Sequence, residues 1–123
     1  MPVILITSNR AKQLLYVQFT EQVAPSDFQQ SREDFVAQLG EMKPGFRLLS
    51  DLSQLESMAV ACAAELGEMM TRVSEAGVGR VVRIIPDPRK DIGMNILAAF
   101  RYRGGPRPIT CDTLAEAVKV LAL

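Results

Sequence analysis

The stretch Phe46-Arg47-Leu48-Leu49-Ser50-Asp51-Leu52 follows the turn-forming pair Pro44-Gly45 and has the apolar content of a β-strand. From Ser57 onward, apolar residues recur at helical spacing as far as Val73, and the pattern stops at Gly77-Val78-Gly79. A strand that is followed directly by a long helix is typical of the β-α units that build parallel sheets. The centre of the chain therefore predicts an α/β fold.

The alternation of strands and helices continues on both sides of this unit. Toward the N-terminus, we expect strands over residues 3–7 and 14–20, and then a helix that ends at residue 39. Ser26 and Gln29 have the spacing of a capping box for that helix. Toward the C-terminus, the sequence predicts in turn a strand over 80–85, a helix that opens at Asp91 and includes Phe100, a strand over 107–111, and a helix that begins with the capping box 113–116.

The expected order of elements is therefore ββαβαβαβα. It predicts a single-wound α/β superhelix with a mostly parallel five-stranded sheet, because consecutive β-α units give right-handed parallel crossovers. The first strand is joined to the second by a short turn, so it should lie antiparallel at one edge. No linker divides the chain, and we expect a single domain over residues 1–123.

The expected strands have one apolar face and one mixed face. Strands that helices cover on both faces are usually apolar throughout, so this pattern indicates that the helices lie mostly on one side of the sheet. The other face would then be free for a partner or a second copy of the chain. The alternative is that Arg47 and Arg83 extend past their apolar neighbours to water.

The composition excludes several kinds of chemistry. The 123 residues contain no histidine, so Ser-His-Asp and Cys-His catalysis and histidine metal ligation are ruled out. The two cysteines, Cys62 and Cys111, have neither disulfide nor zinc spacing, and we expect buried thiols. We expect no metal and no cofactor. The first apolar run is too short for a signal peptide or a membrane span, so the predicted location is the cytoplasm.

The formal net charge is zero, which argues against nucleic acid as a partner. The charges are divided along the chain, however: residues 1–79 carry 6 basic and 10 acidic side chains, and residues 80–123 carry 8 and 4. Arg101, Arg103 and Arg107 are the densest basic group, and they are candidates for binding an anion or an acidic partner. The alternative is an ordinary solvated basic surface.

Polar residues gather where the parallel strands are expected to end. Ligands commonly bind at the carboxyl ends of parallel strands, next to helix N-termini. The residues expected at this edge are Ser26, Asp27, Asp51, Ser53, Ser57, Asp87, Arg89 and Lys90. The alternative is a loop surface that is rich in capping residues.

Three passages resemble the STAS domain of bacterial anti-sigma-factor antagonists and sulfate transporters, and in particular its stand-alone SpoIIAA-like members. Residues 22–28 are similar to the lead-in from the second strand to the first helix. Residues 46–53 are similar to the third strand with its Asp-Phe/Leu-Ser turn, here Asp51-Leu52-Ser53, and residues 113–118 are similar to the last helix. The resemblance implies a regulatory, non-enzymatic domain that binds a protein partner, in some members an anti-sigma-factor kinase.

The resemblance also implies a phosphorylated serine at the start of the second helix, and here the sequence departs from the family. The Asp-Ser-Ser/Thr-Gly box is missing. Without gaps it aligns with Ala59-Val60-Ala61-Cys62, which has no hydroxyl group. With a three-residue deletion it aligns with Glu56-Ser57-Met58-Ala59, which makes Ser57 the candidate phosphoacceptor and Glu56 the replacement for the aspartate. The alternative is that Ser57 is only the helix N-cap.

Our main hypothesis from the sequence is a regulatory domain that docks a protein partner, with a second copy of the chain as an alternative. The predicted docking residues are Asp51, Ser53, Glu56, Ser57, Arg89 and Lys90. A second hypothesis is a small-ligand or lipid-binding domain whose apolar pocket is lined by Met58, Met70, Met94 and Phe100. A third is an enzyme that acts through Asp51, Ser57 or Lys90 without histidine.

Overall fold

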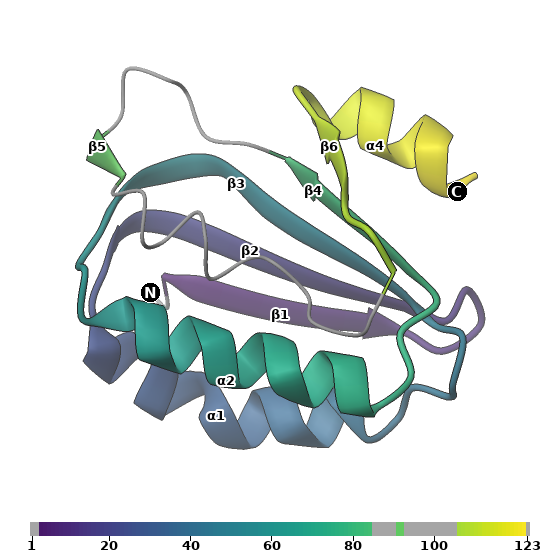
Figure 1. Ribbon diagram of the computed structural model, residues 1–123, viewed down its shortest axis with the longest axis horizontal. Coiled ribbons are helices and arrows are strands. Elements are labelled where there is room, and N and C mark those ends of the chain that lie inside the picture. Colours follow the sequence, from purple (N-terminus) through teal and green to yellow (C-terminus); the bar gives the residue numbers. More distant parts are fainter. Residues whose placement is uncertain (1–2, 85–90, 93–105, 123) are drawn as a thin grey trace.

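The computed structural model describes residues 3–84, 91–92 and 106–122 (Figure 1). Its elements, in chain order, are β1 (Ile4–Asn9), β2 (Leu14–Val23), α1 (Pro25–Leu39), β3 (Arg47–Met58), α2 (Cys62–Glu75), β4 (Arg80–Ile84), β5 (Asp91–Ile92), β6 (Ile109–Cys111) and α4 (Leu114–Leu121). In the described residues this order agrees with the predicted succession of strands and helices except at β5, and the boundary between β3 and α2 differs from the prediction.

The sheet has the predicted topology. Its strand order is β1-β2-β3-β4-β6, with β1 antiparallel to β2 and the other neighbours parallel. The two-residue β5 adds a sixth strand, which pairs in parallel with the end of β3. The predicted single-wound, mostly parallel sheet with an antiparallel edge strand is confirmed.

The two faces of the sheet carry separate apolar cores. Helices α1 and α2 lie together on one face, and α4 lies on the other (Figure 1). Leu48 belongs to the larger core under α1 and α2, whereas the next residue, Leu49, belongs to a smaller core with Ala117 and Leu121 of α4. Neighbouring strand residues point to opposite faces, so alternation along β3 feeds both cores. The face that the mixed pattern left open for a partner is thus covered by α4 where it passes over β3 and β4.

Strand β3 is longer than predicted and reaches Met58, so the expectation that a helix begins at Ser57 is wrong. The pairing with β2 shifts register twice, because β3 has an extra residue between Asp51 and Gln54 and another between Leu55 and Ser57. These β-bulges bring Leu52, Leu55 and Met58 into the same core although they are three residues apart. Serine is a common helix N-cap, and helical spacing follows Ser57 in the sequence, but the backbone of Ser57 pairs with Gln22 of β2 instead.

The predicted N-cap of the last helix is confirmed, and the predicted N-cap of the first helix is wrong. Helix α4 has Thr113 as its N-cap, and the Thr113 hydroxyl accepts a hydrogen bond from the Glu116 amide, as predicted. Helix α1 begins one residue earlier than Ser26, at Pro25, with Ala24 as the N-cap. The Asp27 carboxylate accepts the Ala24 amide at 2.8 Å, so Asp27 takes the role that Gln29 was expected to have. Proline is well suited to the first position of a helix because it has no amide hydrogen to satisfy.

The helix that was expected to open at Asp91 does not begin there, because the backbone of Asp91 and Ile92 pairs with Ser57 and Met58 as β5. The remainder of that prediction, including Phe100, lies outside the described residues. The last strand is shorter than predicted and covers only Ile109–Cys111.

Candidate functional site

Asp51 lies in the middle of β3 and is buried, with 3% of its surface exposed. One carboxylate oxygen accepts the Tyr16 hydroxyl at 2.6 Å. The other accepts the Ser53 amide at 2.9 Å and the Ser53 hydroxyl at 2.6 Å. Ser53 is one of the two residues at the first bulge of β3, where the regular ladder is interrupted. Asp51 therefore satisfies a bulge amide that would otherwise have no partner in the sheet.

The environment of Asp51 affects the neighbouring phenol. Burial is the main cause that raises the pKa of Tyr16 above its ordinary value, and the hydrogen bond to Asp51 and its negative charge act in the same direction. No ion pair involves Asp51 within the described part of the chain. Both carboxylate oxygens already accept hydrogen bonds from the protein, so this arrangement supports a structural role at the bulge better than contact with a ligand.

Ser57 is half-buried in β3, opposite Gln22 of β2 and Asp91 of β5. It is not the N-cap of α2, because that helix begins at Cys62 with Ala61 as its N-cap. The ungapped alignment of the phosphorylation box, Ala59 to Cys62, is therefore the one that falls at the start of the helix, and it has no hydroxyl group. Phosphorylation of Ser57 stays a prediction, and it no longer has a helix N-terminus to support it.

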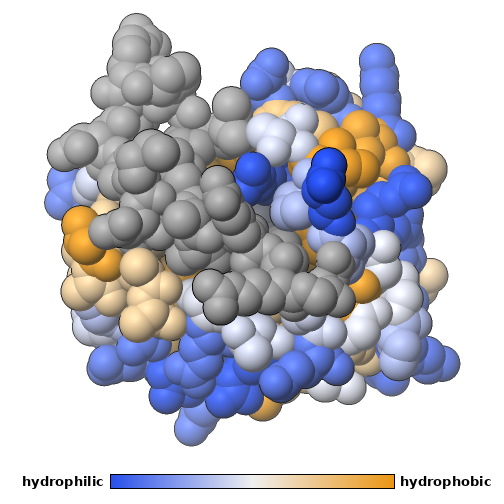
Figure 2. Space-filling view, viewed as in Figure 1, coloured by the Kyte–Doolittle hydropathy of each residue, from blue (hydrophilic) through white to orange (hydrophobic). Residues whose placement is uncertain are grey.

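The loop between β3 and α2, residues 59–61, is apolar and exposed. Val60 is 61% exposed, more than any other large apolar side chain in the described residues, and Ala59 and Ala61 beside it are also exposed. In Figure 2 hydrophobic colour gathers at the left edge of the molecule, where Figure 1 places this loop. In the sequence, residues 59–61 fall within the helix predicted from Ser57 and align with a box without a hydroxyl group, whereas in the structure they precede α2. The missed signal is a run of three apolar residues directly after a strand.

The other predicted docking residues are distributed differently. Glu56 is exposed and lies close to the loop in sequence, whereas Ser53 is half-buried and bonded to Asp51. Arg89 and Lys90 lie outside the described residues. Among the predicted docking residues that the structure describes, only Glu56 is exposed, and it lies three residues before the β3–α2 loop.

Two of the three predicted anion-binding arginines, Arg101 and Arg103, lie outside the described residues. Arg107 is exposed just before β6. The two arginines on the mixed strand face have protein partners: Arg47 donates to the Leu121 carbonyl at the end of α4, and Arg83 donates to the Thr110 hydroxyl at 2.9 Å.

Of the methionines predicted to line an apolar pocket, the two that the structure describes are packed in the core. Met58 is 4% and Met70 is 3% exposed, and both belong to the core under α1 and α2, while Met94 and Phe100 lie outside the described residues. Cys62 and Cys111 are buried free thiols, as predicted, and burial is the main cause that raises the pKa of each.

Within the described residues, no three side chains of the His, Cys, Asp or Glu types are grouped as a metal site. Among the same residues, no helix has both the length and the apolar character needed to cross a membrane.

Comparison with known proteins gives structural matches only. No family model and no curated protein sequence matches the chain. The unphosphorylated form of the anti-sigma factor antagonist SpoIIAA is similar with a TM-score of 0.64 and 14% identity, over 97% of both chains. A protein of the DUF3478 family from Shewanella loihica PV-4, described as having a SpoIIAA-like fold, matches with a TM-score of 0.65 and 18% identity. That match covers 96% of this chain and 93% of the other.

At these identities the likeness concerns the fold, and it extends over nearly the whole chain. Together with the strand order and the antiparallel edge strand, it confirms the fold that the resemblance of residues 22–28, 46–53 and 113–118 predicted. The chain has the SpoIIAA-like fold.

Proposed function

We propose that the chain is a non-enzymatic regulatory domain that docks a protein partner through the loop 59–61 between β3 and α2. The observation that carries the proposal is the exposure of Val60, which is 61% accessible between two exposed alanines. A partner that covers contiguous exposed apolar side chains removes them from water, which favours association.

The base of the loop is well supported by the rest of the fold. The Ala59 amide donates to the Val23 carbonyl at 3.1 Å, and the Cys62 amide donates to the Ala59 carbonyl at 2.9 Å. Cys62 itself is completely buried. A loop held at both ends presents Val60 in a fixed position, which reduces the entropy that binding would cost.

The likeness to an anti-sigma factor antagonist supports a regulatory role for the docking event. That protein is named as an antagonist of an anti-sigma factor. We infer the same class of function here, with a kinase-type partner as the more specific hypothesis.

The experiment is affinity capture from the source cells with the wild-type chain and with Val60→Glu as bait. We expect a specific protein to be retained by the wild type and lost with Val60→Glu. The matched control is Val36→Glu, which places the same charge at an apolar position of α1 that is 42% exposed. A partner that is retained equally by both variants would contradict docking at the loop.

The kinase hypothesis has its own test on the captured partner. Incubation with ATP and mass spectrometry would detect phosphate on the chain. Phosphate at Ser57 that disappears with Ser57→Ala would support the hypothesis. A chain that stays unmodified would show that the captured partner does not phosphorylate it.

A further inference from the structure

A groove of about 350 Å³ lies between the edge strand β1 and helix α1, and it shares no lining residue with the loop 59–61. One wall is apolar and comes from β1. The other wall is polar and comes from α1. The lining residues are Val3, Ile4, Leu5, Ile6, Asp27, Gln30, Ser31 and Asp34.

The polar wall follows from the helical spacing of its residues. Asp27, Gln30, Ser31 and Asp34 recur at intervals of three and four, so they form one stripe along α1. The adjoining stripe, with Phe28 and Phe35, is buried in the core. The acidic stripe therefore lies next to an apolar strand instead of facing only water.

Each of the two carboxylates in the groove has one oxygen engaged. One oxygen of Asp27 accepts the Ala24 amide at 2.8 Å, and one oxygen of Asp34 accepts the Gln38 side-chain amide at 3.0 Å. The described residues place no lysine or arginine nitrogen within 4.0 Å of either carboxylate, since the three ion pairs found there all involve Glu65 or Glu68. The second oxygen of each carboxylate is available to a cationic donor.

The apolar wall offers aliphatic side chains that an aliphatic stem can contact. Val3 and Ile6 are half-buried beside the groove. Gln38 donates to the Ile6 carbonyl at 2.8 Å and ties the helix to the strand beyond Asp34. Lysine and arginine combine an aliphatic stem with a cationic head, and they bury the stem along apolar surface while the head reaches polar groups.

From this complementarity we propose that the groove binds a lysine or arginine side chain of a basic segment in a partner protein. The aliphatic stem packs on Val3 and Ile6, and the cation pairs with the Asp34 carboxylate. Asp27 lies two helical turns, about 10 Å, further along α1 and adds negative charge to the same groove. A second copy docked groove to groove would bring four carboxylates together, so the charge selects a foreign basic segment over self-association. This surface is additional to the proposed docking loop and does not depend on it.

The test uses a fluorescent peptide of alternating lysine and valine as the probe, with the full chain as the receptor and anisotropy as the readout. We expect saturable binding that Asp34→Asn weakens about tenfold, because a charge-assisted bond in a partly enclosed groove is replaced by a neutral one. The same peptide with glutamate in place of lysine should not bind.

The matched control is Glu33→Gln, which removes an equal charge from the neighbouring position of α1. Glu33 and Asp34 are both exposed, but only Asp34 lines the groove. We expect it to leave the affinity of the probe unchanged within about twofold, since screened surface charges contribute little. Equal weakening by Glu33→Gln and Asp34→Asn would overturn the proposal, as would the absence of probe binding to the wild type. Self-association of the wild type that Asp34→Asn abolishes would overturn it in favour of a second copy.

Discussion

At the scale of single residues, the neighbours Ser50 and Asp51 show how the sheet handles buried polar groups. Asp51 is bonded to Tyr16 and Ser53, whereas the Ser50 hydroxyl is buried without a hydrogen-bond partner in the described residues. Removal of an acceptor leaves buried donors unsatisfied, and removal of an unsatisfied hydroxyl does not. The two positions should therefore respond differently to alanine.

We predict that Asp51→Ala lowers the free energy of unfolding by about 2–4 kcal/mol, because the Tyr16 hydroxyl and the Ser53 amide lose their acceptor. Ser50→Ala is the matched control, and its effect should lie within about 0.5 kcal/mol of zero. Urea unfolding followed by circular dichroism measures both. Similar destabilisation by the two variants would show that Asp51 contributes only through packing.

Tyr16 gives the chain an alkaline pH dependence whose sign can be worked out. Its pKa is raised in the folded state above the ordinary value of about 10. Above pH 10 the unfolded state therefore releases the phenol proton while the folded state retains it, so stability is present below pH 10 and falls as the pH rises further.

We predict that wild type is more stable than Tyr16→Phe at neutral pH and that this difference shrinks above pH about 10. The measurement is urea unfolding of both proteins across the alkaline range. Because all other groups titrate in both proteins, the difference isolates Tyr16. A difference that stays constant with pH would contradict the raised pKa.

At the scale of elements, the turns before β3 and β4 pack backbone against backbone. The Gly45 amide donates to the Gly77 carbonyl, and the Gly79 amide donates to the Phe46 carbonyl, both at 2.7 Å. A Cβ atom on Gly79 would lie 2.7 Å from the Gly45 carbonyl oxygen, closer than such atoms approach. Glycine at residue 79 therefore allows the two strand starts to lie side by side.

We predict that Gly79→Ala lowers the free energy of unfolding by about 1–3 kcal/mol, since the two turns must separate. Gly67→Ala makes the same chemical change within α2, where nothing lies within 4 Å of the added Cβ atom. It should raise stability by up to about 1 kcal/mol, because alanine favours the helix. Thermal unfolding compares the pair, and a stable Gly79→Ala protein would contradict the close approach.

Also at this scale, α4 is fixed to the sheet through its C-terminal end. Arg47 donates to the Leu121 carbonyl and Arg80 donates to the Val120 carbonyl, the latter at 3.0 Å. These carbonyls end the helix, and the two cations oppose the partial negative charge there. The adjacent strand starts of β3 and β4 thus orient the helix that forms the second core.

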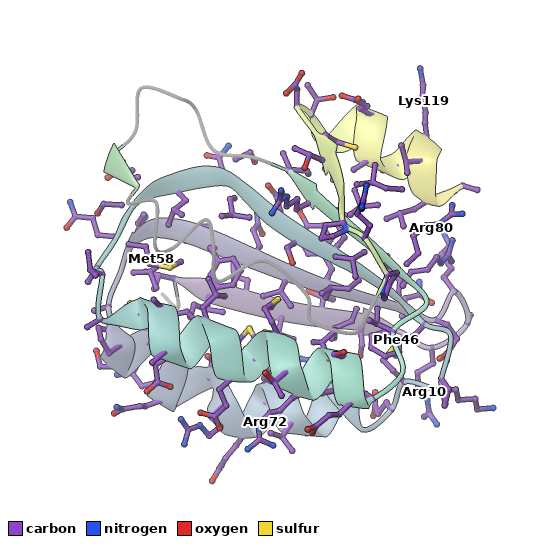
Figure 3. The ribbon with its side chains drawn as sticks, in the orientation of Figure 1. Arg10, Phe46, Met58, Arg72, Arg80 and Lys119 are labelled. Atoms are coloured by element: carbon purple, nitrogen blue, oxygen red, sulfur yellow. The ribbon has the colours of Figure 1, made fainter. Side chains whose placement is uncertain are left out.

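At the scale of the whole molecule, the described residues do not keep the acidic part (1–79) and the basic part (80–123) of the sequence on separate sides of the fold. Arg10, from the turn between β1 and β2, lies at the same end of the molecule as Arg80 and Lys119 (Figure 3). Cations from both parts of the sequence thus lie along one side of the molecule. Arg32, in contrast, bridges α1 and α2 through Glu65 at 3.0 Å.

This arrangement changes what the charge division means for partners. The neutral net charge combines a basic end with an acidic groove along α1, so each proposed contact has its own local charge. Local fields of this kind select partners more than net charge does. Association of two copies stays a prediction, and sedimentation of the wild type measures it.

The sequence by itself determined most of the order of the elements, though not β5, and it excluded histidine chemistry. Hydrophobic periodicity is local, so the strand at residues 80–84 and the helix capped by Thr113 were predictable from the chain. The lack of histidine and of a hydroxyl group in residues 59–62 is likewise a fact of the sequence.

Only the tertiary structure decided where β3 ends and which surfaces carry the candidate sites. Leu52, Leu55 and Met58 have a spacing that suits either a helix turn or a bulged strand, and pairing with the shorter β2 selects the strand. The groove needs α1 and β1 to lie together, and the exposure of Val60 follows from the later start of α2. These features depend on contacts between distant segments, which no local pattern encodes.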